Sequence, residues 1–88
     1  MALVTRLVLD VLKPHQPGVV IFSKNLASLN PQYRVTVKVT EVDKQTETTV
    51  VVIEGPSVDV DHVKAAIEDM GASIHSVDEV EAVGDLGK

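Results

Sequence analysis

The sequence predicts an α+β sandwich in which two helices cover one face of a four-stranded antiparallel sheet. Four segments are rich in valine and other β-branched residues, which favour strands. Two further segments carry apolar residues at helical spacing. The order strand, helix, strand, strand, helix, strand is that of the ferredoxin-like βαββαβ fold. We therefore expect a single ferredoxin-like domain over residues 1–83 and a flexible C-terminal tail over residues 84–88.

The first strand is predicted over residues 3–13, and both of its faces are largely apolar. Leu3, Thr5, Leu7, Leu9 and Val11 alternate along it with Val4, Arg6, Val8, Asp10 and Leu12. Two apolar faces suit a central strand that is covered on both sides. Pro14 ends this strand, and Pro17 is expected to begin a helix that reaches about Leu29.

The second and third strands form a predicted hairpin. Val35, Val37 and Val39 alternate with polar residues, which indicates a half-buried strand over residues 34–42. A turn over residues 43–46 leads into the return strand over residues 47–54.

The second helix has terminal signals at both ends. Asp59 is placed to cap its N-terminus, and Gly71 is placed to end it in the left-handed conformation. Val58 and Val63 have the spacing of a hydrophobic staple around the cap. The last strand follows over residues 73–83.

The usual strand order of this fold leaves one face of the sheet without helices, with the first and third strands in the middle. Because the first strand is apolar on both sides, we expect aliphatic side chains on the uncovered face to mediate a homo-oligomer. The predicted interface residues are Val4, Arg6, Val8 and Leu12. The alternative is a monomer with a modest apolar surface.

Asp10 is an acidic residue in the middle of an apolar strand. A carboxylate that is taken out of water needs a partner, so either a salt bridge, an interface contact or a bound cation is expected. If the last strand pairs antiparallel with the first, Asp78 falls near Asp10 and His75 near Lys13. Two carboxylates so close need a cation or a shared proton between them.

A possible divalent cation is therefore the one cofactor that the sequence suggests. The candidate ligands are Asp10, His75, Asp78 and Glu79. Oxygen ligands suit calcium or magnesium, whereas His75 would be a better ligand for a transition metal. The alternative is a set of solvated acids on an edge strand.

A second candidate site lies between the first strand and the first helix. Lys13 and His15 could hold an anion or a small ligand at the helix N-terminus. The alternative for His15 is an ordinary surface histidine. This site leads to a second hypothesis, a small-molecule-sensing regulatory domain with its ligand bound between subunits near residues 14–18.

Composition excludes several function classes. There is no cysteine, so disulfides, zinc-thiolate sites and cysteine nucleophiles are absent. Eight basic and thirteen acidic residues give a net charge of -5, and there are two aromatic residues, which argues against nucleic acid as a partner. No glycine-rich phosphate loop, nucleophile motif or membrane-length apolar run is present. We expect a cytoplasmic protein without a membrane anchor and, in the main hypothesis, without enzymatic activity.

Three segments together resemble a mainly archaeal family known as domain of unknown function 211. They are RLVLDVLKPH at residues 6–15, AIEDMG at residues 66–71 and IHSVDEV at residues 74–80. The resemblance extends from about Leu3 to Val83. It implies a ferredoxin-like fold and ring-like homo-oligomers, and it brings no established activity or catalytic residue.

Overall fold

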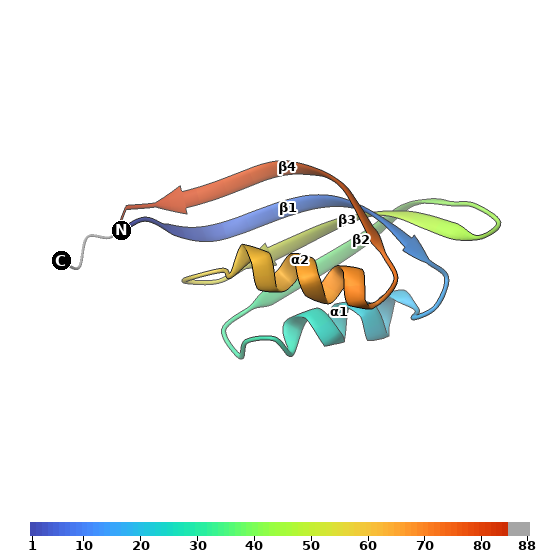
Figure 1. The fold of residues 1–88 in the computed structure, drawn as a ribbon, viewed down its shortest axis with the longest axis horizontal. Helices are drawn as coiled ribbons and strands as arrows, with labels where there is room; N and C mark the ends of the chain where they lie inside the picture. Colours follow the sequence, from blue (N-terminus) through green and yellow to red (C-terminus); the bar gives the residue numbers. More distant parts are fainter. Residues whose placement is uncertain (85–88) are drawn as a thin grey trace.

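A computed structural model describes residues 1–84 (Figure 1). The elements in chain order are β1 (Leu3–Pro14), α1 (Val19–Ala27), β2 (Arg34–Val42), β3 (Thr46–Glu54), α2 (Val60–Asp69) and β4 (Ser73–Val83). This order, with one antiparallel sheet and two helices, confirms the predicted ferredoxin-like α+β fold. The predicted tail falls on residues 84–88, of which 85–88 lie outside the described part of the chain.

The four strands form one sheet in the order β2-β3-β1-β4, and every neighbouring pair is antiparallel. β1 and β3 are therefore the central strands, as predicted. Both helices lie on the same side of this sheet (Figure 1). None of the helices within residues 1–84 has the length and apolarity needed to cross a membrane.

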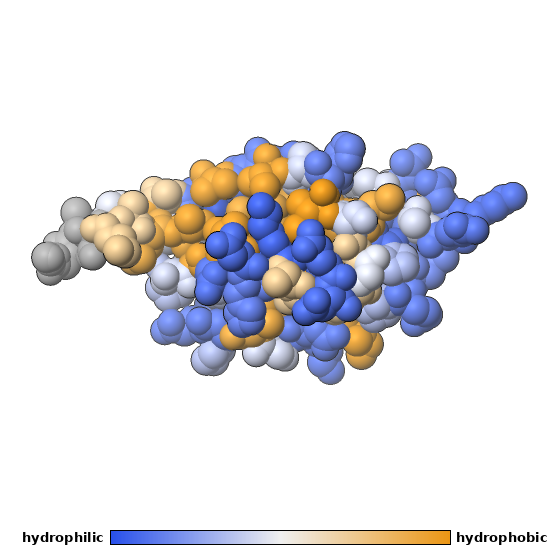
Figure 2. All heavy atoms as spheres, viewed as in Figure 1, coloured by the Kyte–Doolittle hydropathy of each residue, from blue (hydrophilic) through white to orange (hydrophobic). Residues whose placement is uncertain are grey.

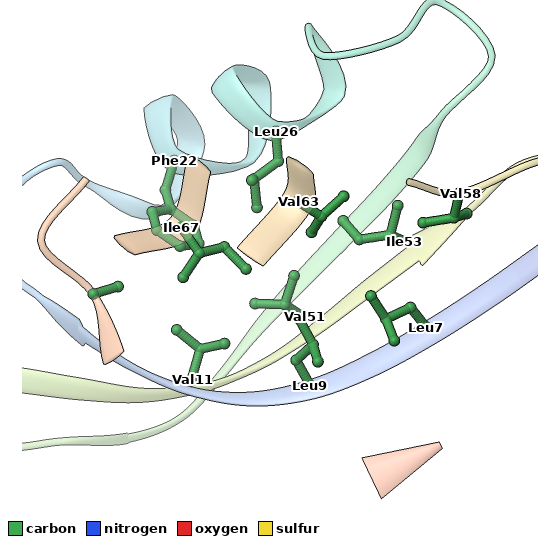
Figure 3. Packing of buried hydrophobic residues seen from close by; sticks show 11 residues of the cluster. Leu7, Leu9, Val11, Phe22, Leu26, Val51, Ile53, Val58, Val63 and Ile67 are labelled. Atoms are coloured by element: carbon green, nitrogen blue, oxygen red, sulfur yellow. The ribbon is translucent and has the colours of Figure 1, made fainter. Parts of the chain in front are cut away.

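The core lies between the helices and the inner face of the sheet (Figure 3). β1 contributes Leu7, Leu9 and Val11, so its odd-numbered residues are the ones that meet the helices. Their partners are Val51 and Ile53 of β3, Phe22 and Leu26 of α1, and Val63 and Ile67 of α2. Burying one such side chain contributes about 1.5–3 kcal/mol, so this face fixes the orientation of β1.

Helix α1 is shorter than predicted. It begins at Val19, with Gly18 as its N-cap, and it ends at Ala27. The first backbone hydrogen bond runs from the Phe22 amide to the Gly18 carbonyl at 2.9 Å. The prediction that Pro17 begins the helix was wrong, because the Pro17 carbonyl accepts a hydrogen bond from Lys13 and belongs to the loop.

Helix α2 has the predicted ends. The Asp59 carboxylate accepts a hydrogen bond from the His62 amide at 3.1 Å, which confirms the N-cap. Val58 and Val63 are both buried in the core. Gly71 has φ 85°, the left-handed conformation that ends many helices. Local residue preferences were therefore sufficient to define this helix.

The pairing of β1 with β4 is interrupted three times. The register shifts between Val4 and Arg6, between Val8 and Leu9, and between Asp10 and Val11. The first shift lies at Thr5 and breaks the alternation of β1. Val4 consequently packs against the core, so the prediction that it shares the uncovered face with Val8 was wrong.

The exposed apolar surface also differs from the prediction. On the uncovered face Val8 is only 8% exposed, and Leu12 is 41% exposed. Apolar side chains also gather where β1 and β4 extend beyond the helices (Figures 1 and 2). On β4 the exposed apolar residues are Val77, Val80 and Val83. The helices are too short to cover this end of the sheet.

Replacing Gly71 by alanine should lower the free energy of unfolding by about 1–2 kcal/mol, because an L-residue is strained at this positive φ. The nearest atom to an added Cβ is the Pro14 Cγ at 3.8 Å, so steric overlap contributes nothing. Urea unfolding measures the change. Gly84→Ala, where no atom lies within 4 Å, is the matched control and should change stability little. Equal stability of both variants would contradict the left-handed conformation of Gly71.

Candidate functional site

A pocket opens on the face of the sheet that the helices leave uncovered. Asp10 and Leu12 of β1, Thr48 of β3 and His75 of β4 line a volume of about 210 Å³. Asp10 and Leu12 alternate with the buried Val11, which places both on this outer face. The pocket therefore combines residues from three adjacent strands.

Asp10 is half-buried and His75 is exposed. Within residues 1–84, neither side chain has a hydrogen bond or an ion pair. Arg6, Lys13 and His15, by contrast, each have a partner. A carboxylate in partly apolar surroundings is stabilised by a cation or a donor. The pocket thus presents one unpaired acid beside one unpaired imidazole.

The register assumed for the last strand was wrong by about two residues. Asp10 lies opposite Ser76, and Val8 lies opposite Glu79. His75 and Asp78 are each the extra residue at a register shift of β4. Such bulges are common on edge strands and redirect side chains, which explains why simple alternation misplaced both residues.

The four predicted cation ligands consequently separate. Asp10 and His75 share the pocket, whereas Asp78 accepts a hydrogen bond from Ser76 at 2.6 Å and Glu79 pairs with Arg6 at 2.9 Å. In the described part of the chain, no three His, Asp or Glu side chains are close enough to hold a metal ion together.

Arg6 bridges three strands on the uncovered face. Its guanidinium contacts Glu79 of β4 at 2.9 Å and Glu54 of β3 at 2.8 Å. The hydrogen bond to Glu79, followed by that to Glu54, raises the pKa of Arg6 above its ordinary value. Arg6 was predicted as an interface residue, and its charged group is engaged within the chain.

Lys13 is fully buried at the end of β1. Its ammonium group donates to the carbonyls of Pro14 and Pro17 at 2.8 and 2.7 Å, and it contacts a Glu47 carboxylate oxygen at 3.0 Å. The Phe22 ring centroid lies 5.8 Å away. Because a lysine has three N–H donors, these acceptors use all of them. The structure therefore gives no support to an anion held by Lys13.

His15 lies in the loop between β1 and α1 and reaches the β2–β3 hairpin. Its Nδ1 is 3.1 Å from a Glu47 oxygen, and its Nε2 is 2.9 Å from the Lys44 carbonyl oxygen. The hydrogen bond to Glu47, and then that to the Lys44 backbone, raises the pKa of His15. Hydrogen bonds from His15 and Lys13 lower the pKa of Glu47.

Three residues of these sites were not singled out from the sequence: Glu47, Thr48 and Glu54. The signal for Glu47 was present, since Lys13 is in phase with the apolar residues Leu9 and Val11 and should be buried with a partner. The pairing of β1 with β3 then sets Glu47 opposite Lys13. A helix and another strand separate β1 from β3 in the chain, so no turn sets this register and the sequence alone did not show the partner.

Comparison with known proteins gives two matches. The sequence profile of the domain of unknown function 211 family, described as "Uncharacterized ArCR", matches residues 5–86. The chain is also similar to "Uncharacterized protein MJ0319" of Methanocaldococcus jannaschii, with 44% identity over 79 residues. That alignment covers 90% of this chain and 81% of the relative.

Replacing Lys13 by methionine should lower the free energy of unfolding by about 3–5 kcal/mol, because Glu47 and two loop carbonyls lose a buried donor. Urea unfolding measures the loss. Lys24→Met, at an exposed position of α1, is the matched control and should be nearly neutral. If Lys13→Met were as stable as the control, the buried network would not hold the loop.

Proposed function

The chain belongs to the domain of unknown function 211 family, and we propose that it is a non-enzymatic module that assembles with copies of itself and binds a divalent cation. The family description and the name of the relative give no activity. The proposal therefore depends on the surfaces of this chain. Its main support is the opposite charge of the two edges of the sheet.

The edge strand β2 has a net positive charge and the edge strand β4 has a net negative charge. On β2 the exposed charged residues are Arg34, Lys38 and Glu41. Asp78, Glu79 and Glu81 are exposed on β4. Each edge strand also has unpaired backbone groups along its outer side, which can pair with another strand. Opposite charges on two such edges favour contact between β2 of one copy and β4 of the next.

Contact between two different surfaces of the same chain is a heterologous interface, which closes into a ring when the rotation between copies permits it. The exposed apolar residues Val77, Val80 and Val83 also lie on β4, beside the edge that would form this contact. Exposed apolar side chains beside an unpaired edge are typical of an interaction surface. A ring of copies is thus the form of assembly that we propose.

The cation is proposed for the pocket of Asp10 and His75. Support comes from Asp10, a half-buried residue whose carboxylate has no hydrogen bond or ion pair within residues 1–84. Two protein ligands leave several coordination positions, which water or a neighbouring copy would fill. Calcium or magnesium would bind through Asp10 and water, whereas a transition metal would also use His75.

Native mass spectrometry of the untagged protein tests the assembly. The wild type should give one species of high order. Lys38→Glu should reverse the charge of the β2 edge and shift the protein towards monomer, because like charges across an interface cost several kcal/mol. Lys24→Glu, at an exposed site on α1, is the matched control and should assemble as the wild type does. A monomeric wild type would overturn the proposed assembly.

Mixing two charge-reversed variants tests the pairing of the edges. Lys38→Glu has two acidic edges, and Asp78→Lys has a β4 edge of reduced negative charge beside the basic β2 edge. Each variant alone should assemble less than the wild type, and Lys38→Glu should lose more assembly, because Asp78→Lys keeps Glu79 and Glu81 on its β4 edge. The mixture should assemble with the two variants alternating, since each β2 edge then faces a β4 edge of more favourable charge. Failure to assemble on mixing, with an oligomeric wild type, would place the interface elsewhere.

Isothermal titration with calcium, magnesium and zinc, each alone, tests the cation site. Asp10→Asn should weaken binding of the preferred ion at least about tenfold, because the neutral amide is a poorer ligand. Asp69→Asn, at an exposed site of α2, is the control and should not change binding. His75→Gln should weaken the binding of zinc and leave the binding of calcium and magnesium unchanged. Equal binding by Asp10→Asn and the wild type would exclude this site.

A further inference from the structure

His15 connects two segments that are distant in sequence. It belongs to the loop between β1 and α1, and its ring contacts the tip of the β2–β3 hairpin at two points. One contact is to the Glu47 carboxylate at the start of β3, and the other is to the Lys44 carbonyl in the turn. The His15 side chain is 38% exposed, so protons from solvent can reach it.

Both atoms that face the ring of His15 are acceptors. An ionised carboxylate and a backbone carbonyl have no proton to donate. A neutral imidazole carries one N–H and could satisfy only one of them. The two contacts at 3.1 and 2.9 Å can therefore exist together as hydrogen bonds only when both ring nitrogens are protonated.

The polar groups around His15 come from β1, from β3 and from the turn between β2 and β3. Glu47 of β3 faces Nδ1 and has a second oxygen bound by Lys13 of β1. In the turn, the Lys44 backbone accepts from Nε2, and the Asp43 backbone also favours the protonated ring. The buried Lys13 is fully engaged and fixes Glu47 in place. Glu47 is thus held ready for His15 whatever the state of the ring.

We propose that His15 is a pH-sensitive latch, which holds the tip of the β2–β3 hairpin against the β1–α1 loop when its ring carries two protons. Loss of one proton removes one of the two hydrogen bonds and the attraction to Glu47. Within the turn, the Asp43 amide donates a hydrogen bond to the Thr46 carbonyl at 2.8 Å. Deprotonation therefore loosens the hairpin tip while Lys13 and Glu47 keep the start of β3 in place.

The pH range of the latch follows from the directions of the two pKa shifts. The pKa of His15 is raised from 6.5, so its contribution is complete below pH 6.5 and is lost as the pH rises through the higher folded-state value. The pKa of Glu47 is lowered from 4.5, so its contribution is complete above pH 4.5 and is lost as the pH falls through the lower folded-state value. The latch is closed between these limits and opens on the alkaline side as His15 loses a proton.

An NMR titration of the His15 ring tests whether Glu47 stabilises the doubly protonated ring. Its midpoint should lie above 6.5 in the wild type, and Glu47→Gln should lower this midpoint because the carboxylate charge is removed. His62→Gln, at an exposed site of α2, is the control and should leave the His15 midpoint unchanged. A wild-type midpoint at or below 6.5 would overturn the latch.

Hydrogen exchange at the Asp43 amide tests whether the hairpin tip loosens when His15 loses a proton. The variants used here keep the Lys13–Glu47 pair intact. After correction for intrinsic rates, wild-type protection should fall about tenfold as the pH passes through the His15 titration. In His15→Gln protection should be low at every pH, and in His62→Gln it should follow the wild type. The proposal would be overturned if the protection of the Asp43 amide did not depend on pH in the wild type, or if it were as high in His15→Gln as in the wild type.

Discussion

The alternation of side chains along β1 is the constraint on which the rest of the structure depends. β1 is paired on both sides, so its two faces are set across the whole sheet. The inner face, with Leu7, Leu9 and Val11, is closed by the helices. The outer face presents Arg6, Asp10 and Leu12. Because a shift of one residue would exchange these sets, the burial of the inner face also fixes where the outer polar residues lie.

The same alternation brings Lys13 into the buried layer, and the consequences reach two loops. An ammonium group removed from water needs acceptors for all of its protons. The Pro14 and Pro17 carbonyls supply two, which shapes the loop that carries His15. Glu47 supplies the third and also faces His15. A single buried charge thus organises the β1–α1 loop and the adjacent hairpin, and it sets the conditions for the latch.

β4 differs from the inner strands because it is an edge strand, paired on one side only. Its bulges interrupt the ladder at His75 and Asp78, and its far end extends beyond the helices. This strand carries exposed acids, exposed valines and one wall of the Asp10 pocket. Assembly and cation binding are therefore proposals about the same edge, and a neighbouring copy at this edge would affect both.

The sequence by itself determined the order of the elements, the central place of β1 and both ends of α2, since caps and periodicity act over a few residues. It also selected Asp10 and His75 as candidate ligands, and only the structure showed that both line one pocket. Only the tertiary structure decided the β1–β4 register, the inward position of Val4 and the Lys13–Glu47 pair. These features depend on bulges and on contacts between distant segments, because packing across the sheet outweighs local preference there.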